Sequence, residues 1–362
     1  MAAPAILNPA PMTLPSPITP TQSRTLGALL GVHAGDSLGA TLEFEPHHRI
    51  KTKYPRGLHS IIGGGPFSWP AGHATDDTDM TRGVLLAYQT YHQNRTRKPS
   101  PVPEGENNVA LFSAQNFLEW YQGRNWPGRN PGTEPLDIGT ATRIGLQKFA
   151  KTGDPERAGA GRGSMGNGSL MRCIPSALFH QDLCAMERET MRISSITHDD
   201  YGCQVACAAY NAMVAALVSG ASSEYAVKAG EAAAVRLENG ERHGKVYKAI
   251  QEGKSWSLKE LAEWGPPTPP HGSREKPKTF AGYVMETLSI AVAALLDGRP
   301  FQDVVIDVVR VGMDTDTNGA VAGGLVGARD GVEMIPRVWR EKLQFGEEFV
   351  RVGMKTLELM RM

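Results

Sequence analysis

The stretch Asp314–Ala328, with the sequence DTDTNGAVAGGLVGA, decides the fold of this chain. After its polar opening it contains almost only glycine, alanine, valine and leucine. A helix with so many small residues packs at close range against neighbours on several sides. The acidic N-terminus of this helix is therefore predicted to lie deep in the structure.

A near-copy of its acidic opening occurs much earlier, at Thr75-Asp76-Asp77-Thr78 in GHATDDTDM, before a predicted helix from Asp77 to about Tyr91. Carboxylates at a helix N-terminus face unpaired N–H groups and the positive end of the dipole, so either motif alone is most often a cap. Neither motif contains Lys or Arg. If the carboxylates of both motifs converge, they repel one another unless a cation lies between them. Two motifs together therefore favour a cation site over two caps.

Composition restricts the class of protein. The chain has 362 residues, 41% hydrophobic and 21% charged, as in a soluble globular protein. Its 38 basic and 38 acidic residues cancel, which argues against a nucleic-acid binder with a strongly basic surface. The most apolar stretch, LSIAVAALL, is too short to span a membrane. The four cysteines lack CxxC spacing, so buried free thiols and a reducing, intracellular location are expected.

The periodicity is helical along most of the chain. Strand-type alternation is nearly absent, which predicts an all-α, single-domain assembly of orthogonally packed helices. Residues 1–20, with six prolines and no charge, are predicted to be a flexible arm, and helix is predicted from about Thr21. Residues 45–74 are predicted to form a long ordered loop that leads into the first acidic motif. Residues 241–280 are predicted to be a surface insertion.

Other candidate site residues lie outside the two acidic motifs. Glu43 stands among apolar neighbours, as either a boundary charge or a functional carboxylate. Asp137 fits either a helix cap or a functional position. Residues 159–168, GAGRGSMGNG, form a loop whose N–H groups suit phosphate oxygens, although it matches neither the dinucleotide fingerprint nor a P-loop. His198, at a helix junction, is equally well read as a cap or as a substrate contact.

The clustered ligands are all hard oxygen donors, which favours an octahedral Mg²⁺ or Mn²⁺ site over zinc. Two ions are predicted at this site. Such a pair can hold vicinal hydroxyls or phosphate oxygens and lower the pKa of bound water. Beside a glycine-rich anion loop, such a site indicates a substrate with both a diphosphate and a sugar. The candidate ligands are Glu43, Thr75, Asp76, Asp77, Asp314, Asp316 and Thr317.

Seven segments in their order along the chain resemble the ADP-ribosylglycohydrolase family. They are GVHAGDSLGATLEF, GHATDDTDM, LDIGTATRIGL, GNGSLMRCIP, ITHDD, GYVMETLSIAVAALL and GMDTDTNGAVAGGLVGA. The resemblance covers residues from about 25 to 340 and is greatest to the branch of the dinitrogenase-reductase-activating glycohydrolase. It implies one all-α catalytic domain over residues 21–362, built around a dinuclear Mg²⁺ or Mn²⁺ centre. It also implies hydrolysis of the bond at the anomeric carbon of ADP-ribose.

The resemblance also implies roles for individual residues. Acid and base chemistry falls to Glu43, Asp77, Asp137 and Asp316, with acid and base left unassigned among them. The implied metal ligands are Thr75, Asp76, Asp77, Asp314, Asp316 and Thr317. The implied substrate contacts are Gly163, Ser164, Gly166, Asn167, Gly168, Ser169, His198 and Tyr283. The chain departs from the family where THD replaces THP, and where Met165 stands in place of an aromatic residue found in some members.

The expected substrate is an ADP-ribosylated protein and the expected product is ADP-ribose, with arginine as the favoured acceptor. Serine-linked ADP-ribose, poly(ADP-ribose), O-acetyl-ADP-ribose and ADP-ribosylated nucleic acid stay open, as does a non-catalytic ADP-ribose-binding protein. The intact acidic motifs argue against the binding protein, and the companion motifs argue against a metal-dependent phosphohydrolase. A monomer in the cytoplasm or nucleus, with no membrane or nucleic-acid partner, is expected.

Overall fold

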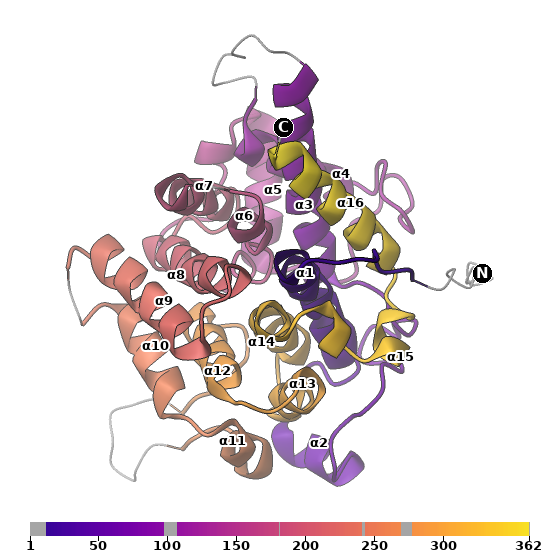
Figure 1. The fold of residues 1–362 in the computed structure, drawn as a ribbon, viewed down its shortest axis with the longest axis vertical. Helices are drawn as coiled ribbons and strands as arrows, with labels where there is room; N and C mark the ends of the chain where they lie inside the picture. Colours follow the sequence, from indigo (N-terminus) through magenta and orange to yellow (C-terminus); the bar gives the residue numbers. More distant parts are fainter. Residues whose placement is uncertain (1–11, 98–106, 181, 241–242, 269–276, 362) are drawn as a thin grey trace.

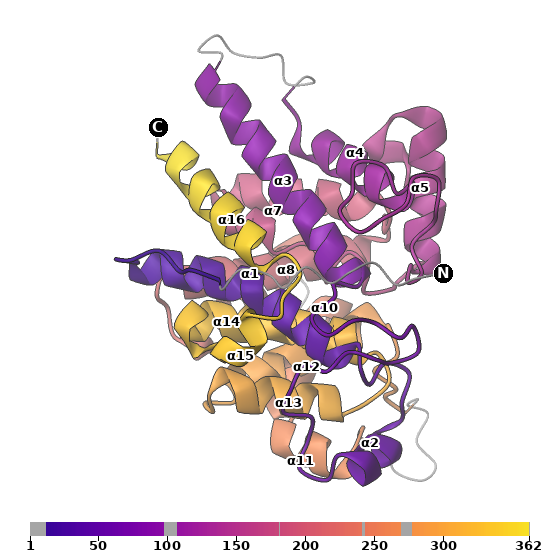
Figure 2. The ribbon, with the colours of Figure 1, turned by 90° about the vertical axis from the view of Figure 1, so that its right-hand side faces the viewer.

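Two antiparallel helices, α1 (Pro20–Gly39) and α14 (Thr315–Asp330), lie side by side at the centre of the molecule (Figures 1 and 2). The computed structural model describes residues 12–97, 107–180, 182–240, 243–268 and 277–361. Thr19 starts α1 with a capping box, in which its hydroxyl accepts from the N–H of Gln22 and its own N–H donates to the Gln22 side chain. Almost every residue of both helices is buried.

Glycines allow these two backbones to touch. Every fourth residue of α1 from Gly27 to Gly39 faces a residue of α14 between Thr315 and Gly327. A Cβ added at Gly31 would lie 2.2 Å from the carbonyl oxygen of Gly323, too close for any real contact. The prediction that the small-residue helix packs at close range is therefore confirmed, with α1 as its partner.

The other helices surround this pair. α3 and α16 pack on each other and cross α1 steeply, while α12 and α13 pack on α14 (Figure 2). The expectation of an all-α, orthogonal assembly is confirmed, since no strand occurs in the described ranges. The further helices are α2 (His47–Lys53), α3 (Asp76–Arg97), α4 (Val109–Tyr121), α5 (Thr140–Thr152), α6 (Pro175–Leu178), α7 (Leu183–Ser195), α8 (Tyr201–Val218), α9 (Ser223–Leu237), α10 (Lys245–Ser255), α11 (Leu258–Trp264), α12 (Val284–Leu296), α13 (Phe301–Arg310), α15 (Arg337–Arg340) and α16 (Gly346–Met360), with 3₁₀ turns at Pro155–Arg157 and Val332–Met334.

Three details differ from the sequence expectations. The helix of the first acidic motif begins at Asp76 and runs to Arg97, beyond its predicted end. The predicted loop 45–74 contains α2, which places Ile50 in the core. The predicted surface insertion 241–280 contains α10 and α11, whose apolar sides are buried, and α10 packs on α12. In α10 the buried residues Val246, Ala249, Ile250 and Gly253 recur at helical spacing, so the polar composition of the segment reflects only its exposed face.

The structure bears on two expectations from composition, one about the cysteines and one about membrane-spanning helices. The four cysteines are free, and all but Cys184 are buried. By length and composition α8 could cross a membrane, which the short LSIAVAALL stretch did not suggest, but 67% of it is buried inside the protein. Buried helices at the centre of globular proteins pass the same test. Of the Pro-rich arm, residues 1–11 lie outside the described residues.

Candidate active site

The first acidic motif occupies the start of α3. Asp76 and Asp77 lie in its first turn, and the N–H of Asp77 donates to Thr75 Oγ1 at 3.3 Å. The apolar residues that follow, Met80 and Val84, are fully buried and anchor the helix in the core. The Thr75 hydroxyl in turn donates to Asp77 Oδ2 at 3.2 Å, while Asp77 Oδ1 has no hydrogen-bond partner among the described residues.

The second motif meets the first. Asp314 precedes α14 but makes no side-chain cap bond, and Thr315 donates its hydroxyl to Gly39 O at 2.7 Å. Thr317 Oγ1 then donates to Asp77 Oδ2 at 3.3 Å. The two stretches, distant in sequence, therefore form one cluster at the end of the α1–α14 pair.

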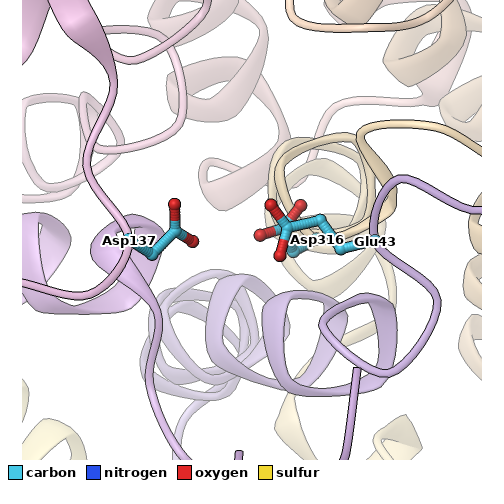
Figure 3. A group of neighbouring side chains, drawn as sticks. All are labelled: Glu43, Asp137 and Asp316. Atoms are coloured by element: carbon cyan, nitrogen blue, oxygen red, sulfur yellow. The ribbon is translucent and has the colours of Figure 1, made fainter. Parts of the chain in front are cut away.

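Glu43 and Asp137 complete the cluster. Oxygen atoms of Glu43, Asp137 and Asp316 all lie within 4.8 Å of one another, and Figure 3 shows the three carboxylates turned toward a common centre. Glu43 follows the end of α1, just beyond the last glycine contact with α14. The capping interpretation of Asp137 is wrong, because α5 begins at Thr140 with Gly139 as its N-cap.

Burial raises the pKa of every carboxyl in the cluster, and repulsion among the carboxyls adds to it. The pKa of Glu43 rises to about 9, through burial and then through Asp137, Asp314 and Asp36. The pKa of Asp137 rises to about 6, through burial and then through Asp314. Burial, followed by neighbouring carboxylates, raises the pKa of Asp316 well above its ordinary value. Negative charge is thus concentrated here at high cost.

The donor set fits a divalent cation. Glu43 Oε2, Asp77 Oδ1 and Asp316 Oδ1 are buried and have no hydrogen-bond partner among the described residues. Buried carboxylate oxygens rarely stay unpaired unless they bind an ion or water. Carboxylate and hydroxyl oxygens are the ligands that Mg²⁺ and Mn²⁺ prefer. The cluster can therefore hold a divalent metal.

A cavity of about 600 Å³ joins this cluster to the glycine-rich loop. Glu43, Asp76, Asp137, Asp314, Asp316 and Thr317 line one part of it. Ser164, Gly166, Asn167, Gly168 and His198 also line it, as do residues 138–142 and Ile144 at the start of α5. One cavity is therefore lined both by carboxylates that suit a cation and by glycine-rich backbone that suits an anion.

The glycine-rich loop is tied to the second motif. Asn167 Nδ2 donates to Asp314 Oδ2 at 2.7 Å and to Thr287 Oγ1 at 3.0 Å. The N–H of Gly163 donates to Asp200 Oδ2 at 2.8 Å, and Gly163 does not line the cavity. Ser169 also lies away from the cavity, with its hydroxyl 2.9 Å from Ser194 Oγ and 3.5 Å from Cys207 Sγ. The loop therefore presents Ser164 to Gly168 to the cavity.

His198 and Tyr283 both adjoin Gly166 of the glycine-rich loop, but they differ in their relation to the cavity. His198 is 3% exposed and lines the cavity, and it caps neither neighbouring helix, since Ile196 closes α7 and Asp200 starts α8. Tyr283 starts α12 and is 39% exposed, and the cavity lining stops at the adjacent Gly282. The structure thus brings His198, but not the Tyr283 side chain, into the cavity.

Asp36 is a site residue that the sequence analysis missed. It lies fully buried within α1, accepts from the N–H groups of Thr75 at 3.2 Å and Thr78 at 3.3 Å, and also bonds the Thr78 hydroxyl. It therefore fixes the start of α3 from a neighbouring helix. Burial raises its pKa to about 7. The available signal was that Asp36 is the single carboxylate of α1 and follows the apolar and small residues 26–35, among which only His33 is polar.

Asp79 is the second missed residue. Its two oxygens accept from Trp120 Nε1 at 2.7 Å and Trp126 Nε1 at 2.9 Å. Burial raises its pKa to about 6. These bonds turn Asp79 away from the cluster, so it braces α3 against α4 and the segment after it. The pairing joins residues far apart in sequence, so no local pattern could have indicated it.

The pKa shifts predict a pH-dependent stability in a chelator. The folded pKa values of Asp137, Asp36 and Glu43 lie at about 6, 7 and 9, above unfolded values of about 4. The folded chain then binds more protons than the unfolded chain over this range, so stability falls as pH rises from about 5 to 9. Thermal unfolding in EDTA at several pH values measures this, and Glu43→Gln should weaken the decline. A wild-type melting temperature in EDTA that rises from pH 5 to 9, with a smaller rise in Glu43→Gln, would contradict this prediction.

Comparison with known proteins gives consistent matches. The profile of the family described as ADP-ribosylglycohydrolase matches residues 17–362. The chain is 29% identical over 345 residues to "ADP-ribosylarginine hydrolase Tri1" of Pseudomonas putida (strain GB-1), covering 94% of this chain and 80% of that protein. It is 30% identical over 341 residues to "ADP-ribosyl-[dinitrogen reductase] glycohydrolase" of Rhodospirillum rubrum, covering 93% of this chain and 94% of that protein.

A solved structure shows the same fold. A chain of an "ADP-ribosylglycohydrolase-related protein complex" matches with a TM-score of 0.70 and 26% identity, over 95% of this chain and 100% of that one.

Proposed function

The chain belongs to the ADP-ribosylglycohydrolase family, and from that premise we propose that it releases ADP-ribose from ADP-ribosylated arginine in proteins. The observation that carries the proposal is a single cavity lined by both the carboxylate cluster and the glycine-rich loop, which the Asn167–Asp314 hydrogen bond joins. The carboxylates suit a cation that holds the ribose hydroxyls beside the anomeric carbon. The glycine-rich loop suits the diphosphate.

A second recess supports arginine as the acceptor. It has a volume of about 260 Å³ and shares Asp76 and Asp137 with the first cavity. Trp69, Trp120 and Glu134 also line it, as does Arg129. Aromatic faces and carboxylates are good partners for a guanidinium group. The name of one relative, an ADP-ribosylarginine hydrolase, favours the same acceptor, and the name of the other, an ADP-ribosyl-[dinitrogen reductase] glycohydrolase, favours an ADP-ribosylated protein as the substrate.

We propose two Mg²⁺ or Mn²⁺ ions as the cofactor, held by Thr75, Asp76, Asp77, Asp314, Asp316 and Thr317. Bound there, divalent ions would orient the ribose and lower the pKa of water. Asp36 holds the first motif in place through Thr75 and Thr78, and Asn167 holds Asp314. These two contacts keep the ligand oxygens in position before substrate arrives.

The remaining chemistry concerns a proton at the scissile bond. Cleavage at an anomeric carbon passes through an oxocarbenium-like transition state, which nearby carboxylates stabilise. Whichever of Glu43 and Asp137 holds a proton can deliver it to the leaving nitrogen. In the cation-free cluster the pKa of Glu43 is raised to about 9 and that of Asp137 only to about 6, so Glu43 holds a proton more readily at neutral pH. The partner carboxylate then remains to accept a proton from water.

A panel of substrates tests this function. The protein is incubated with Mg²⁺ or Mn²⁺ and with ADP-ribosyl-arginine protein, ADP-ribosyl-serine peptide, poly(ADP-ribose), O-acetyl-ADP-ribose or ADP-ribosylated DNA ends. Chromatography with mass detection then measures free ADP-ribose. Release chiefly from the arginine linkage is expected. Release only from another linkage would overturn the arginine assignment, and binding of ADP-ribose without release from any of them would favour a binding protein.

A further inference from the structure

Arg172 is a fully buried cation behind the cavity wall. It follows the glycine-rich loop in the segment GNGSLMR. One guanidinium nitrogen donates to Gly168 O at 2.8 Å, and another donates to Thr197 Oγ1 at 2.7 Å. The guanidinium lies 4.6 Å above the Phe117 ring, and in the described part of the chain no carboxylate bonds it. Arg172 therefore joins the glycine-rich loop to the segment that carries His198.

The hydroxyl of Thr197 connects Arg172 to the imidazole ring of His198. Thr197 is fully buried, and its Oγ1 lies 2.8 Å from His198 Nδ1. Arginine can only donate, so the hydroxyl oxygen accepts from Arg172. If Nδ1 carried a proton, the hydroxyl hydrogen would find no acceptor among the described residues and would be buried unpaired, which is costly. The hydroxyl therefore donates to Nδ1, and the ring proton lies on Nε2.

The Nε2 side of the ring lies against the glycine-rich loop. A Cβ added at Gly166 would lie 3.2 Å from His198 Nε2, and one at Gly168 would lie 2.9 Å from Cε1. The two glycines thus make room for the ring at the cavity wall. Burial, and then the charge of Arg172, lowers the pKa of His198 to about 3, so the ring is neutral.

A second donor faces the same end of the cavity. The hydroxyl of Thr142, buried and without a hydrogen-bond partner among the described residues, would lie 3.3 Å from a Cβ at Gly168. Thr142 and His198 both line the cavity. An N–H and an O–H donor beside a glycine-rich backbone suit the oxygens of a diphosphate.

We propose that Arg172 and Thr197 are positioning residues that fix His198 in its Nε2–H tautomer, so that it donates a hydrogen bond to a diphosphate oxygen of the bound ADP-ribosyl group. The identity of that ligand rests on the proposed function. The tautomer itself rests only on the contacts of Arg172, Thr197 and His198.

Nuclear magnetic resonance tests the tautomer without any substrate. Correlation of imidazole ¹H and ¹⁵N signals distinguishes the two neutral tautomers, and His198→Gln identifies the signal of His198 by its loss. The Nε2–H tautomer is expected in the wild type and in Thr197→Ser, which keeps the hydroxyl. In Thr197→Val, which cannot donate to Nδ1, the Nε2–H tautomer should no longer be the main form. A wild-type His198 that carries its proton on Nδ1, or on both nitrogens at neutral pH, overturns the proposal.

Calorimetric titration with ADP-ribose, together with steady-state kinetics, tests whether His198 Nε2–H binds the diphosphate. Thr197→Val should weaken ADP-ribose binding and raise KM on the order of 10- to 100-fold, with kcat nearly unchanged. The reason is that the lost hydrogen bond, from His198 Nε2–H to a charged diphosphate oxygen, is equally strong in the ground state and the transition state. Thr197→Ser should match the wild type. His198→Gln, whose amide can replace Nε2–H, should bind better than His198→Leu.

Wild-type affinity in a folded Thr197→Val would contradict the role in binding. A wild type with the Nε2–H tautomer but no affinity for ADP-ribose would contradict the proposed function and the identity of the ligand. It would leave the tautomer assignment intact, so the two failures are distinguishable.

Discussion

Asp316→Asn is expected to lower hydrolysis by more than about 100-fold, because it removes a carboxylate from the centre of the cluster. Replacing residues that only support metal ligands costs about 10- to 100-fold, and Asp316 is itself a proposed ligand. Its carboxylate lies within 4.8 Å of Glu43 and Asp137 oxygens. Initial rates of ADP-ribose release at saturating Mn²⁺ and Mg²⁺ measure the loss.

The fold should survive this change. Burial and repulsion from Glu43, Asp77 and Asp314 raise the pKa of Asp316, so its charge opposes folding when no cation is bound. The melting temperature of Asp316→Asn in EDTA should equal or exceed that of the wild type, while the increase on adding a divalent cation should shrink. Asp303→Asn, at an exposed position in the first turn of α13, is the matched control. It should lower the melting temperature slightly, because it removes a charge that interacts with the helix dipole, and should leave the increase on adding a divalent cation unchanged. Near-normal turnover by Asp316→Asn would refute its role as a ligand.

Gly31→Ala is expected to cost about 3 kcal/mol or more of folding free energy, at the upper end of overpacking changes. The added Cβ would lie 2.2 Å from Gly323 O and 2.9 Å from Gly323 C, both backbone atoms that no side-chain rotation can move. The two central helices would have to separate. Urea unfolding followed by circular dichroism measures the change.

Gly298→Ala is the control for this prediction. A Cβ there would meet nothing within 4 Å, so its effect should stay within about 0.5 kcal/mol. Because α1 and α14 both lead to the cluster, Gly31→Ala should also weaken Mn²⁺ binding. A Gly31→Ala protein as stable as Gly298→Ala would contradict the close backbone contact.

The sequence predicts the centre of this molecule better than its periphery. The small residues in 319–328 predict a helix that packs closely and is buried. An acidic motif that opens a buried helix must itself be buried, and buried carboxylates need a cation. Both acidic motifs could therefore be assigned to one cluster. Glu43 was equally well explained as a boundary charge, because its role depends on where α1 ends against α14. Asp137 resembled a cap, since only the fold shows that its helix starts three residues later.

The residues missed by sequence analysis act through contacts between distant segments. Asp36 reaches the start of α3 from α1, Asp79 joins two indole groups, and Arg172 joins the glycine-rich loop to Thr197. None of these pairs leaves a local pattern. In contrast, Gly166 and Gly168 could be selected from the sequence because a cluster of glycines indicates an anion-binding loop. The sequence does not show that these two positions also need glycine to make room for the His198 ring.

The central claim is that the two acidic motifs form one divalent-cation site. Binding of Mn²⁺ to the wild type, Asp77→Asn and Asp316→Asn, followed by electron paramagnetic resonance of the free ion, tests it most directly. Each substitution lies in a different motif, and we predict that either one alone removes most of the tight Mn²⁺ binding. Wild-type binding in both folded variants would contradict the claim.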